Sequence, residues 1–125
     1  MLWVAIGLLV IMALFHTLIG ERYILQPVKN QAQLPKLWGS EQATFRTIQA
    51  TWQLVSVLWL GLAATLTAIQ LAPENAIRIT LFVFAGVFGV LAIVPLVWDA
   101  GKHKTWIVFG LITASLLAGA LTLPA

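Results

Sequence analysis

Four long apolar runs, separated by charged or turn-forming residues, constrain the fold of this chain most strongly. They cover residues 2–19, 48–71, 77–97 and 106–123. Each run is about 18 to 24 residues long, and a helix needs about 20 residues to cross roughly 30 Å of hydrocarbon. A membrane strand would instead need about 10 residues with strict apolar–polar alternation, which the sequence lacks. The runs therefore predict four transmembrane helices.

The composition points the same way. Hydrophobic residues make up 61% of the chain and charged residues 9%, whereas a soluble domain carries about 25% charged residues. We therefore predict an all-α polytopic membrane protein, an antiparallel bundle of four transmembrane helices. The bundle is expected to form a single transmembrane domain over residues 1–125, with helices at about 2–20, 47–71, 77–97 and 105–123.

The first apolar run resembles a secretory signal peptide only in its length. It has no basic segment before it and no small-residue cleavage pattern after it, so we expect it to remain as a helix. Cysteine is absent from the chain. That absence excludes disulfides, thiol nucleophiles and thiolate metal sites.

Basic residues are distributed unevenly among the three connections. The first connection holds Arg22, Lys29, Lys36 and Arg46, the third holds Lys102 and Lys104, and only Arg78 lies beside the second. The positive-inside rule then places the first and third connections in the cytoplasm and both termini on the outer side. The net charge of +3 needs no nucleic acid partner, because topology and the lipid bilayer with its anionic headgroups explain it.

The first connection is too irregular for one helix, because it contains Pro27 and Pro35. Its segment at residues 34–41 could rest on the lipid headgroups through Leu34, Leu37 and Trp38. Ser40 is expected to cap the second helix, which would then begin before the apolar run.

Polar residues of the second helix form a single stripe, because they recur at spacings of three and four. The stripe consists of Gln49, Trp52, Gln53, Ser56, Trp59, Ala63, Thr67 and Gln70. Lipid cannot satisfy an amide or an indole N–H, so the stripe should face the interior of the bundle. Its first five members are candidates for a ligand site or a polar core. They could serve as packing contacts or line a transport path.

His16 lies about 6 to 8 Å inside the expected inner boundary of the first helix, at 1.5 Å per residue. We predict a neutral imidazole that is hydrogen-bonded to a group on the second helix, with Gln53 or Gln49 as the favoured partner. Trp59 lies on the same face as Ser56, so its indole N–H should find a partner within the protein. Glu21 is five residues further on and about 140° round the helix, so the two do not form a same-face metal motif. Both a structural and a functional role remain open for His16.

Three further groups could gather at the cytoplasmic mouth of the bundle, namely Glu21, Asp99 and His103. They could form a proton-accessible vestibule or a weak metal site with His16. The simpler interpretation is a solvated turn in which Asp99 and Gly101 shape the chain. We assign no catalytic residue and no metal site to them, and the sequence requires no cofactor.

Small residues follow one face of each of the last two helices. The two lines are Ala85, Gly89 and Ala92, and Gly110, Ala114 and Ala118. Small residues let helix backbones approach closely in lipid. The lines predict packing within the chain or, alternatively, an interface between copies.

Three segments carry a resemblance to a known family: "GERYILQP", "TFRTIQATWQLVSVLWLGLAA" and "GKHKTWIVF". They resemble a family of short, uncharacterised bacterial four-span membrane proteins. The resemblance implies four helices in a bacterial inner membrane and implies no activity for any residue.

Three classes of function remain compatible with these features. The first is a non-enzymatic structural or accessory membrane protein that forms a homo-oligomer or joins a larger membrane complex. The second is a small transporter or channel lined by the stripe at Gln49, Gln53 and Ser56. The third is a bundle that binds haem, a quinone or a metal through His16. The first is favoured, because the apolar runs carry few of the charges that drive transport and no nucleophile–base pair is evident.

The distribution of basic residues generates a prediction about topology. Tags fused to either terminus should be accessible to membrane-impermeant reagents from outside the inner membrane, because six basic residues lie in the first and third connections and one beside the second. Labelling in intact spheroplasts measures this. Two tags that react only after lysis would reverse the orientation.

Overall fold

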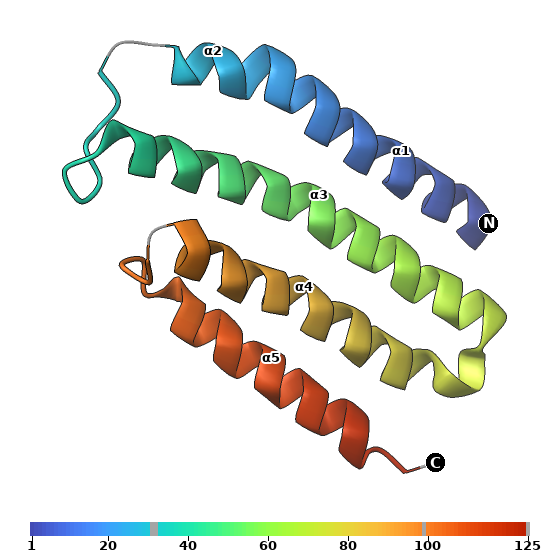
Figure 1. Cartoon of the computed structure of the whole chain (residues 1–125). Coiled ribbons are helices and arrows are strands. Elements are labelled where there is room, and N and C mark those ends of the chain that lie inside the picture. Colours follow the sequence, from blue (N-terminus) through green and yellow to red (C-terminus); the bar gives the residue numbers. More distant parts are fainter. Residues whose placement is uncertain (31–32, 99, 125) are drawn as a thin grey trace. The chain divides into compact units, whose positions relative to one another are not determined.

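The computed structural model describes residues 1–30, 33–98 and 100–124, and the regular elements of these residues are helices, with no β-strand. The elements are α1 (Leu2–Gly20), the π-helix η1 (Glu21–Leu25), α2 (Gln26–Lys29), α3 (Glu41–Leu71), the 3₁₀ helix η2 (Pro73–Asn75), α4 (Ala76–Trp98) and α5 (Thr105–Thr122) (Figure 1). Four of the helical stretches are long and apolar enough to cross a membrane. The prediction of an all-α chain with four such helices is confirmed.

The first helical stretch runs further than the sequence predicts. It continues through η1 and α2 to Lys29, although Pro27 was expected to interrupt it. A proline cannot donate to the carbonyl four residues before it and its ring crowds that carbonyl. The π-turn widens the backbone just before Pro27, and the wider turn lets the helix continue past the proline instead of ending there.

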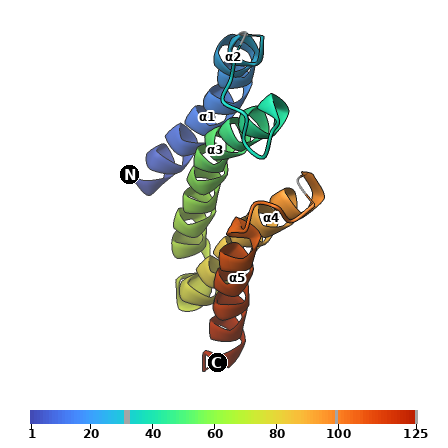
Figure 2. The same ribbon diagram turned by 90° about the vertical axis from the view of Figure 1, so that its left-hand side faces the viewer.

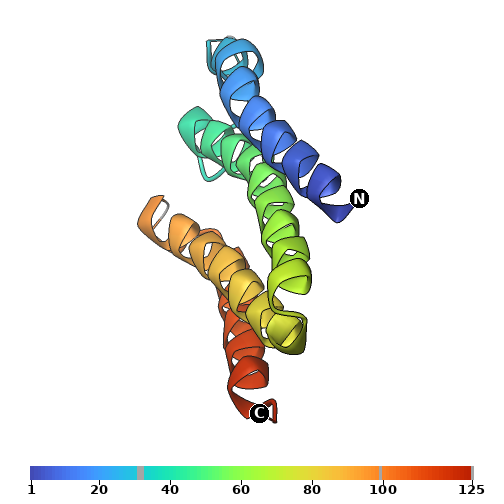
Figure 3. The same ribbon diagram turned by 90° about the vertical axis from the view of Figure 1, so that its right-hand side faces the viewer.

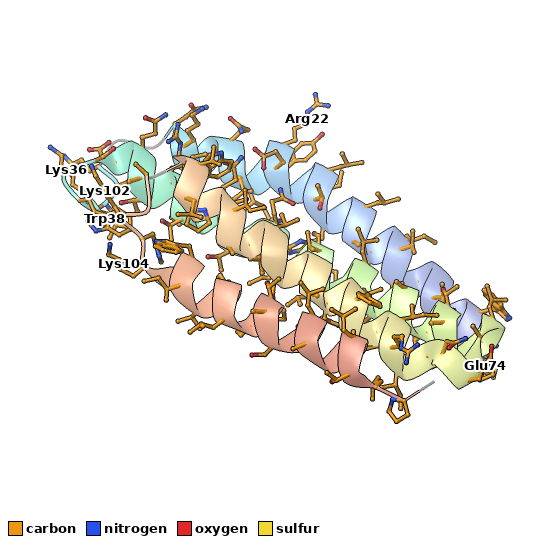
Figure 4. All side chains as sticks on the ribbon, turned by 60° about the horizontal axis from the view of Figure 1, so that its bottom comes forward. Arg22, Lys36, Trp38, Glu74, Lys102 and Lys104 are labelled. Carbon is orange, nitrogen blue, oxygen red and sulfur yellow. The ribbon has the colours of Figure 1, made fainter. Side chains whose placement is uncertain are left out.

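The second long helix begins at Glu41, before its apolar run, and Ser40 caps it as predicted. The Ala43 N–H donates to Ser40 Oγ at 3.2 Å, which satisfies one of the free N–H groups of the first turn. The preceding loop is tied to the same turn, because the Leu37 N–H donates to Thr44 Oγ1 at 2.9 Å. Figure 4 shows Lys36 and Trp38 in this loop.

The chain divides into two compact units. We call Leu8–Leu60 the α1–α3 unit. In it, α1 lies along the first part of α3 and runs antiparallel to it, as Figures 1, 2 and 3 all show. Its best-buried side chains include Ala13 and Leu25, each 1% exposed, and Phe45. The expectation of a single transmembrane domain stays a prediction.

The second unit comprises Met1–Gly7 with Gly61–Ala125, and we call it the α4–α5 unit. Its main feature is an antiparallel hairpin of α4 and α5, in which Phe88 and Phe109 pack with their ring centroids 5.8 Å apart. Arg78 joins the two helices at the open end of the hairpin, where its guanidinium donates to the Leu123 carbonyl at 2.7 Å. Figure 4 shows Glu74 at that end of α4, and Lys102 and Lys104 at the other.

The two lines of small residues differ in their surroundings. On α4, Ala85 and Ala92 are buried, and a Cβ added at Gly89 would touch Thr113 of α5 at 3.6 Å. This line therefore packs within the chain. On α5, by contrast, Ala114 and Ala118 are exposed.

The cap at Ser40 generates a prediction about stability. Ser40→Ala should lower the free energy of unfolding by about 1 kcal/mol, because the side-chain acceptor of the first turn is lost. Ser115→Ala is the matched control, since the exposed Ser115 hydroxyl only donates to the carbonyl one turn before it. Denaturant titration of both variants in mild detergent measures the difference. Equal effects of the two substitutions would contradict the capping role.

Candidate functional site

The candidate site lies in the α1–α3 unit, where polar side chains of the two helices face one another. Three pairs of side chains set the antiparallel register: His16 with Ser56, Thr17 with Gln53, and Glu21 with Gln49. The α3 members are the part of the predicted stripe that begins at Gln49. These α3 side chains contact α1, while the expectation that the stripe faces the interior of a four-helix bundle stays a prediction.

His16 lies at the centre of the contact and is half-buried. Its Nδ1 is 2.8 Å from Ser56 Oγ, and Ser56 is only 3% exposed. The imidazole stacks flat on the Trp52 indole, with centroids 4.4 Å apart and planes 5° apart. The Trp59 ring meets it edge-on at 5.1 Å. Two indoles and a hydroxyl therefore fix the orientation of the imidazole.

The predicted partner of His16 was wrong. Depth in the membrane predicted Gln53 or Gln49 as the partner on the second helix, but the observed partner is Ser56. The two helices are offset by about one turn from that alignment, so that Gln53 lies opposite Thr17. Trp59 also differs from expectation, because among the described residues its contact with His16 is made by the ring and not by an indole hydrogen bond.

The Trp52 indole lies directly against the backbone of α1 at Gly20. The Trp52 indole N–H donates to the His16 carbonyl at 3.0 Å, so this ring both stacks on His16 and bonds to its backbone. A Cβ at Gly20 would lie 2.6 Å from Trp52 Cε2, closer than real atoms come. Only glycine leaves room for the indole at this position.

Glu21 collects hydrogen bonds from three glutamines. Its Oε1 accepts from Gln26 Nε2 at 2.8 Å and from Gln49 Nε2 at 2.7 Å, and its Oε2 accepts from Gln53 Nε2 at 3.2 Å. The Gln53 carbonyl in turn accepts from the Thr17 hydroxyl at 3.0 Å. Glu21, a candidate for the cytoplasmic mouth, is thus the half-buried centre of an amide cluster.

The π-helix η1 shapes this cluster. Gln26 is five residues after Glu21, and its backbone N–H donates to the Glu21 carbonyl in the π pattern. Its side chain consequently returns to the Glu21 carboxylate. The wider π-helical turn also keeps Leu25 on the face that packs against α3, where it is 1% exposed. π-Turns within helices occur frequently at functional sites.

The two remaining candidates for the predicted cytoplasmic mouth are Asp99 and His103. Asp99 lies outside the described residues, and His103 belongs to the α4–α5 unit, where its Nδ1 is 2.9 Å from Thr105 Oγ1. The gathering of Glu21, Asp99 and His103 therefore stays a prediction. Among the residues that the structure describes, no three His, Cys, Asp or Glu side chains come together to hold a metal ion.

Three residues of the α1–α3 contact were not among the predicted site residues: Thr17, Gly20 and Gln26. The first two had a detectable signal, because Ala13, His16, Thr17, Gly20 and Glu21 recur at spacings of three and four on one face of α1. This small and polar face is the complement of the α3 stripe. Gln26 had no such signal, since only the π-turn brings it to Glu21.

Comparisons of the chain with protein-family models, with curated proteins and with solved structures find no match. The resemblance to a bacterial four-span family therefore stays a prediction.

The contact between Gly20 and Trp52 generates a prediction. Gly20→Ala should destabilise the α1–α3 unit, by about 1 to 3 kcal/mol as for other overpacked sites, because the indole must move off His16. Gly7→Ala is the matched control, since a Cβ there meets nothing within 4 Å. Thermal unfolding in detergent and the near-ultraviolet signal of the stacked indole measure both.

A second substitution identifies the cause of that loss. In the double variant Gly20→Ala with Trp52→Leu, the smaller side chain removes the clash, so the two effects should be less than additive. Fully additive effects would show that Gly20 acts through something other than Trp52.

Proposed function

We propose that the chain is an integral protein of the bacterial inner membrane with four spans in an antiparallel bundle and both termini outside. In this proposal it acts as a non-enzymatic structural or accessory component that self-associates or joins a larger membrane complex. Four helices of sufficient length and apolar character support the membrane assignment. The six-to-one distribution of basic residues supports the orientation.

One observation supports the accessory role, namely that polar side chains of the α1–α3 unit form hydrogen bonds with one another. The imidazole bonds to Ser56, the Trp52 indole bonds to the His16 carbonyl, and Gln53 bonds to both Thr17 and Glu21. Such bonds join helices in lipid, where no water competes for them. A network of this kind is typical of interhelical contacts that stabilise a packed bundle.

A hydrolytic role receives less support. Ser56 and His16 form the pair that serine hydrolases use for nucleophile and base. However, Ser56 is 3% exposed, which keeps its hydroxyl away from a substrate, and among the described residues no carboxylate accepts a bond from the imidazole. The pair is therefore better explained as an interhelical hydrogen bond.

Haem, quinone or metal binding through His16 also receives less support. The ring stacks on Trp52 at 4.4 Å and meets Trp59 at 5.1 Å, so an incoming group would have to displace at least one indole. The transporter or channel alternative retains one favourable observation. Glu21 is a carboxylate within a candidate span, and among the described residues no cation pairs with it.

The decisive experiment separates stability from activity at His16. His16→Leu removes the bond to Ser56, and we expect a loss on the order of 1 kcal/mol in the stability of the detergent-solubilised protein. Ser56→Ala is the matched variant, because it removes the same bond from the other helix. In the proposed role both variants lower stability to a similar extent.

Mass and absorbance measurements on the parent protein complete the test. The accessory role predicts a species larger than one chain in mild detergent and no absorbance in the visible range. A monomer, or a His16→Leu variant that is fully stable but loses a bound chromophore or a cellular phenotype, would overturn the proposal.

A further inference from the structure

The turn before α3 holds a tryptophan in a backbone conformation that tryptophan seldom adopts. Trp38 has a φ of 51° and Gly39 a φ of 77°, and the Ser40 N–H closes the turn by donating to the Leu37 carbonyl at 3.1 Å. Two central residues with positive φ are typical of a type I′ turn, which usually takes Gly, Asn or Asp at both places. A bulky side chain at the first of them is a genuine outlier.

Packing of the ring does not account for this conformation, because the Trp38 side chain is 44% exposed. A left-handed backbone at a residue other than glycine costs free energy, which the surrounding structure must supply. Glycine at the same place would remove that cost. Strained residues of this kind cluster at binding sites and switch regions. The exposed ring is therefore a candidate for a contact with a partner.

The turn is fixed to the start of α3. Thr44 Oγ1 accepts a hydrogen bond from the Leu37 N–H at 2.9 Å and donates one to the Pro35 carbonyl. We call residues 35–40 the Trp38 turn. It presents Lys36 and Trp38 from a backbone that α3 holds in place, and Figure 4 shows both side chains at the end of the unit where α3 begins.

A second lysine lies beside the same part of α3. Lys29 Nζ is 5.6 Å from the centroid of the Phe45 ring, and Phe45 directly follows Thr44, which binds the turn. Both Lys29 and Lys36 are exposed. The charge of the α1–α3 unit is confined to this end, because residues 20–47 hold four basic and two acidic side chains, whereas residues 8–15 and 54–60 hold no charged one.

We propose that Lys29, Lys36 and Trp38 form a binding surface for the headgroup of an anionic phospholipid. The two ammonium groups complement the phosphate, and an indole is well suited to the boundary between headgroups and hydrocarbon. A free anion would account for the lysines but not for the exposed ring, whereas a lipid accounts for both. The strained turn holds the ring beside the charged groups.

The proposal goes beyond the accessory role and rests on the membrane location proposed above. Lys29 ends α2 and Lys36 belongs to the turn before α3. A headgroup bound by both would join these two segments, so lipid binding should stabilise the α1–α3 unit by mass action.

The test uses the full chain purified in mild detergent. Thermal unfolding and native mass spectrometry are followed during titration with phosphatidylglycerol, phosphatidylcholine or inorganic phosphate. We expect phosphatidylglycerol to raise the unfolding temperature saturably and to bind more tightly than phosphatidylcholine, by about fivefold for each lysine that pairs with the phosphate. Inorganic phosphate should cause no rise.

Three variants identify the surface. Trp38→Gly should unfold in lipid-free detergent at the temperature of the parent or above it, because glycine relieves the left-handed backbone, and it should lose most of the rise with phosphatidylglycerol. Lys36→Gln should bind this lipid about fivefold more weakly. Lys102→Gln is the matched control, since it removes the same charge from an exposed position in the α4–α5 unit, and it should respond as the parent does.

Four results would overturn the surface. They are equal binding of the two lipids, a rise with inorganic phosphate, equal losses in Lys36→Gln and Lys102→Gln, and an unchanged lipid response in Trp38→Gly. A smaller assembly in Lys36→Gln with unchanged lipid binding would assign the turn to a protein partner and also contradict the proposal. A chain recovered outside the membrane fraction would contradict the proposed membrane location itself, whereas a membrane-bound chain that binds both lipids equally contradicts this inference alone.

Discussion

The close approach of Trp52 to the backbone of Gly20 sets the arrangement of the α1–α3 unit. Because no side chain stands between them, the indole reaches the His16 carbonyl and covers the imidazole at the same time. Every other pairing follows from that register, since Ser56 lies one turn after Trp52 on α3 and Gln49 lies almost one turn before it. The position of one glycine thus determines which polar groups meet.

Two kinds of polar contact are joined along this interface. Around His16 the groups are compact and aromatic, and a hydroxyl and two rings fix one imidazole. Around Glu21 the side chains are long, and three amides that can both donate and accept hydrogen bonds converge on one carboxylate. The first arrangement is well suited to rigid packing. The second is less rigidly specified, because each glutamine amide has both an N–H donor and an oxygen acceptor.

The sequence predicted the helices well and their register poorly. Runs of apolar residues determine where a helix can cross lipid, and Ser40 marks where α3 begins, so both could be recognised locally. The α3 face from Gln49 to Trp59 was also predictable, because its polar residues share one helical period. The pairing of His16 with Ser56 was not, since it depends on a contact between residues 32 positions apart, Gly20 and Trp52, whose effect cannot be read from depth alone.

The amide cluster illustrates a second limit of the sequence. Glu21 follows directly after an apolar run, and a glutamate in that place is typical of a solvated helix end. Its burial required the opposite helix, and the contribution of Gln26 required a π-turn that no hydrophobic period encodes. Pro27 and Pro35 predicted an irregular first connection, but a widened backbone turn lets the helix continue past Pro27.

The separation of these partners along the chain has a consequence for biosynthesis. Glu21 and Gln49 are 28 positions apart, and His16 and Ser56 are 40 apart. At about 5 to 20 residues per second, the ribosome completes α1 several seconds before the polar face of α3 has been made. In the membrane protein proposed above, a lone α1 would expose an imidazole and a carboxylate to lipid during that interval. Membrane insertion should therefore favour release of α1 and α3 together, as a hairpin whose polar faces are already joined.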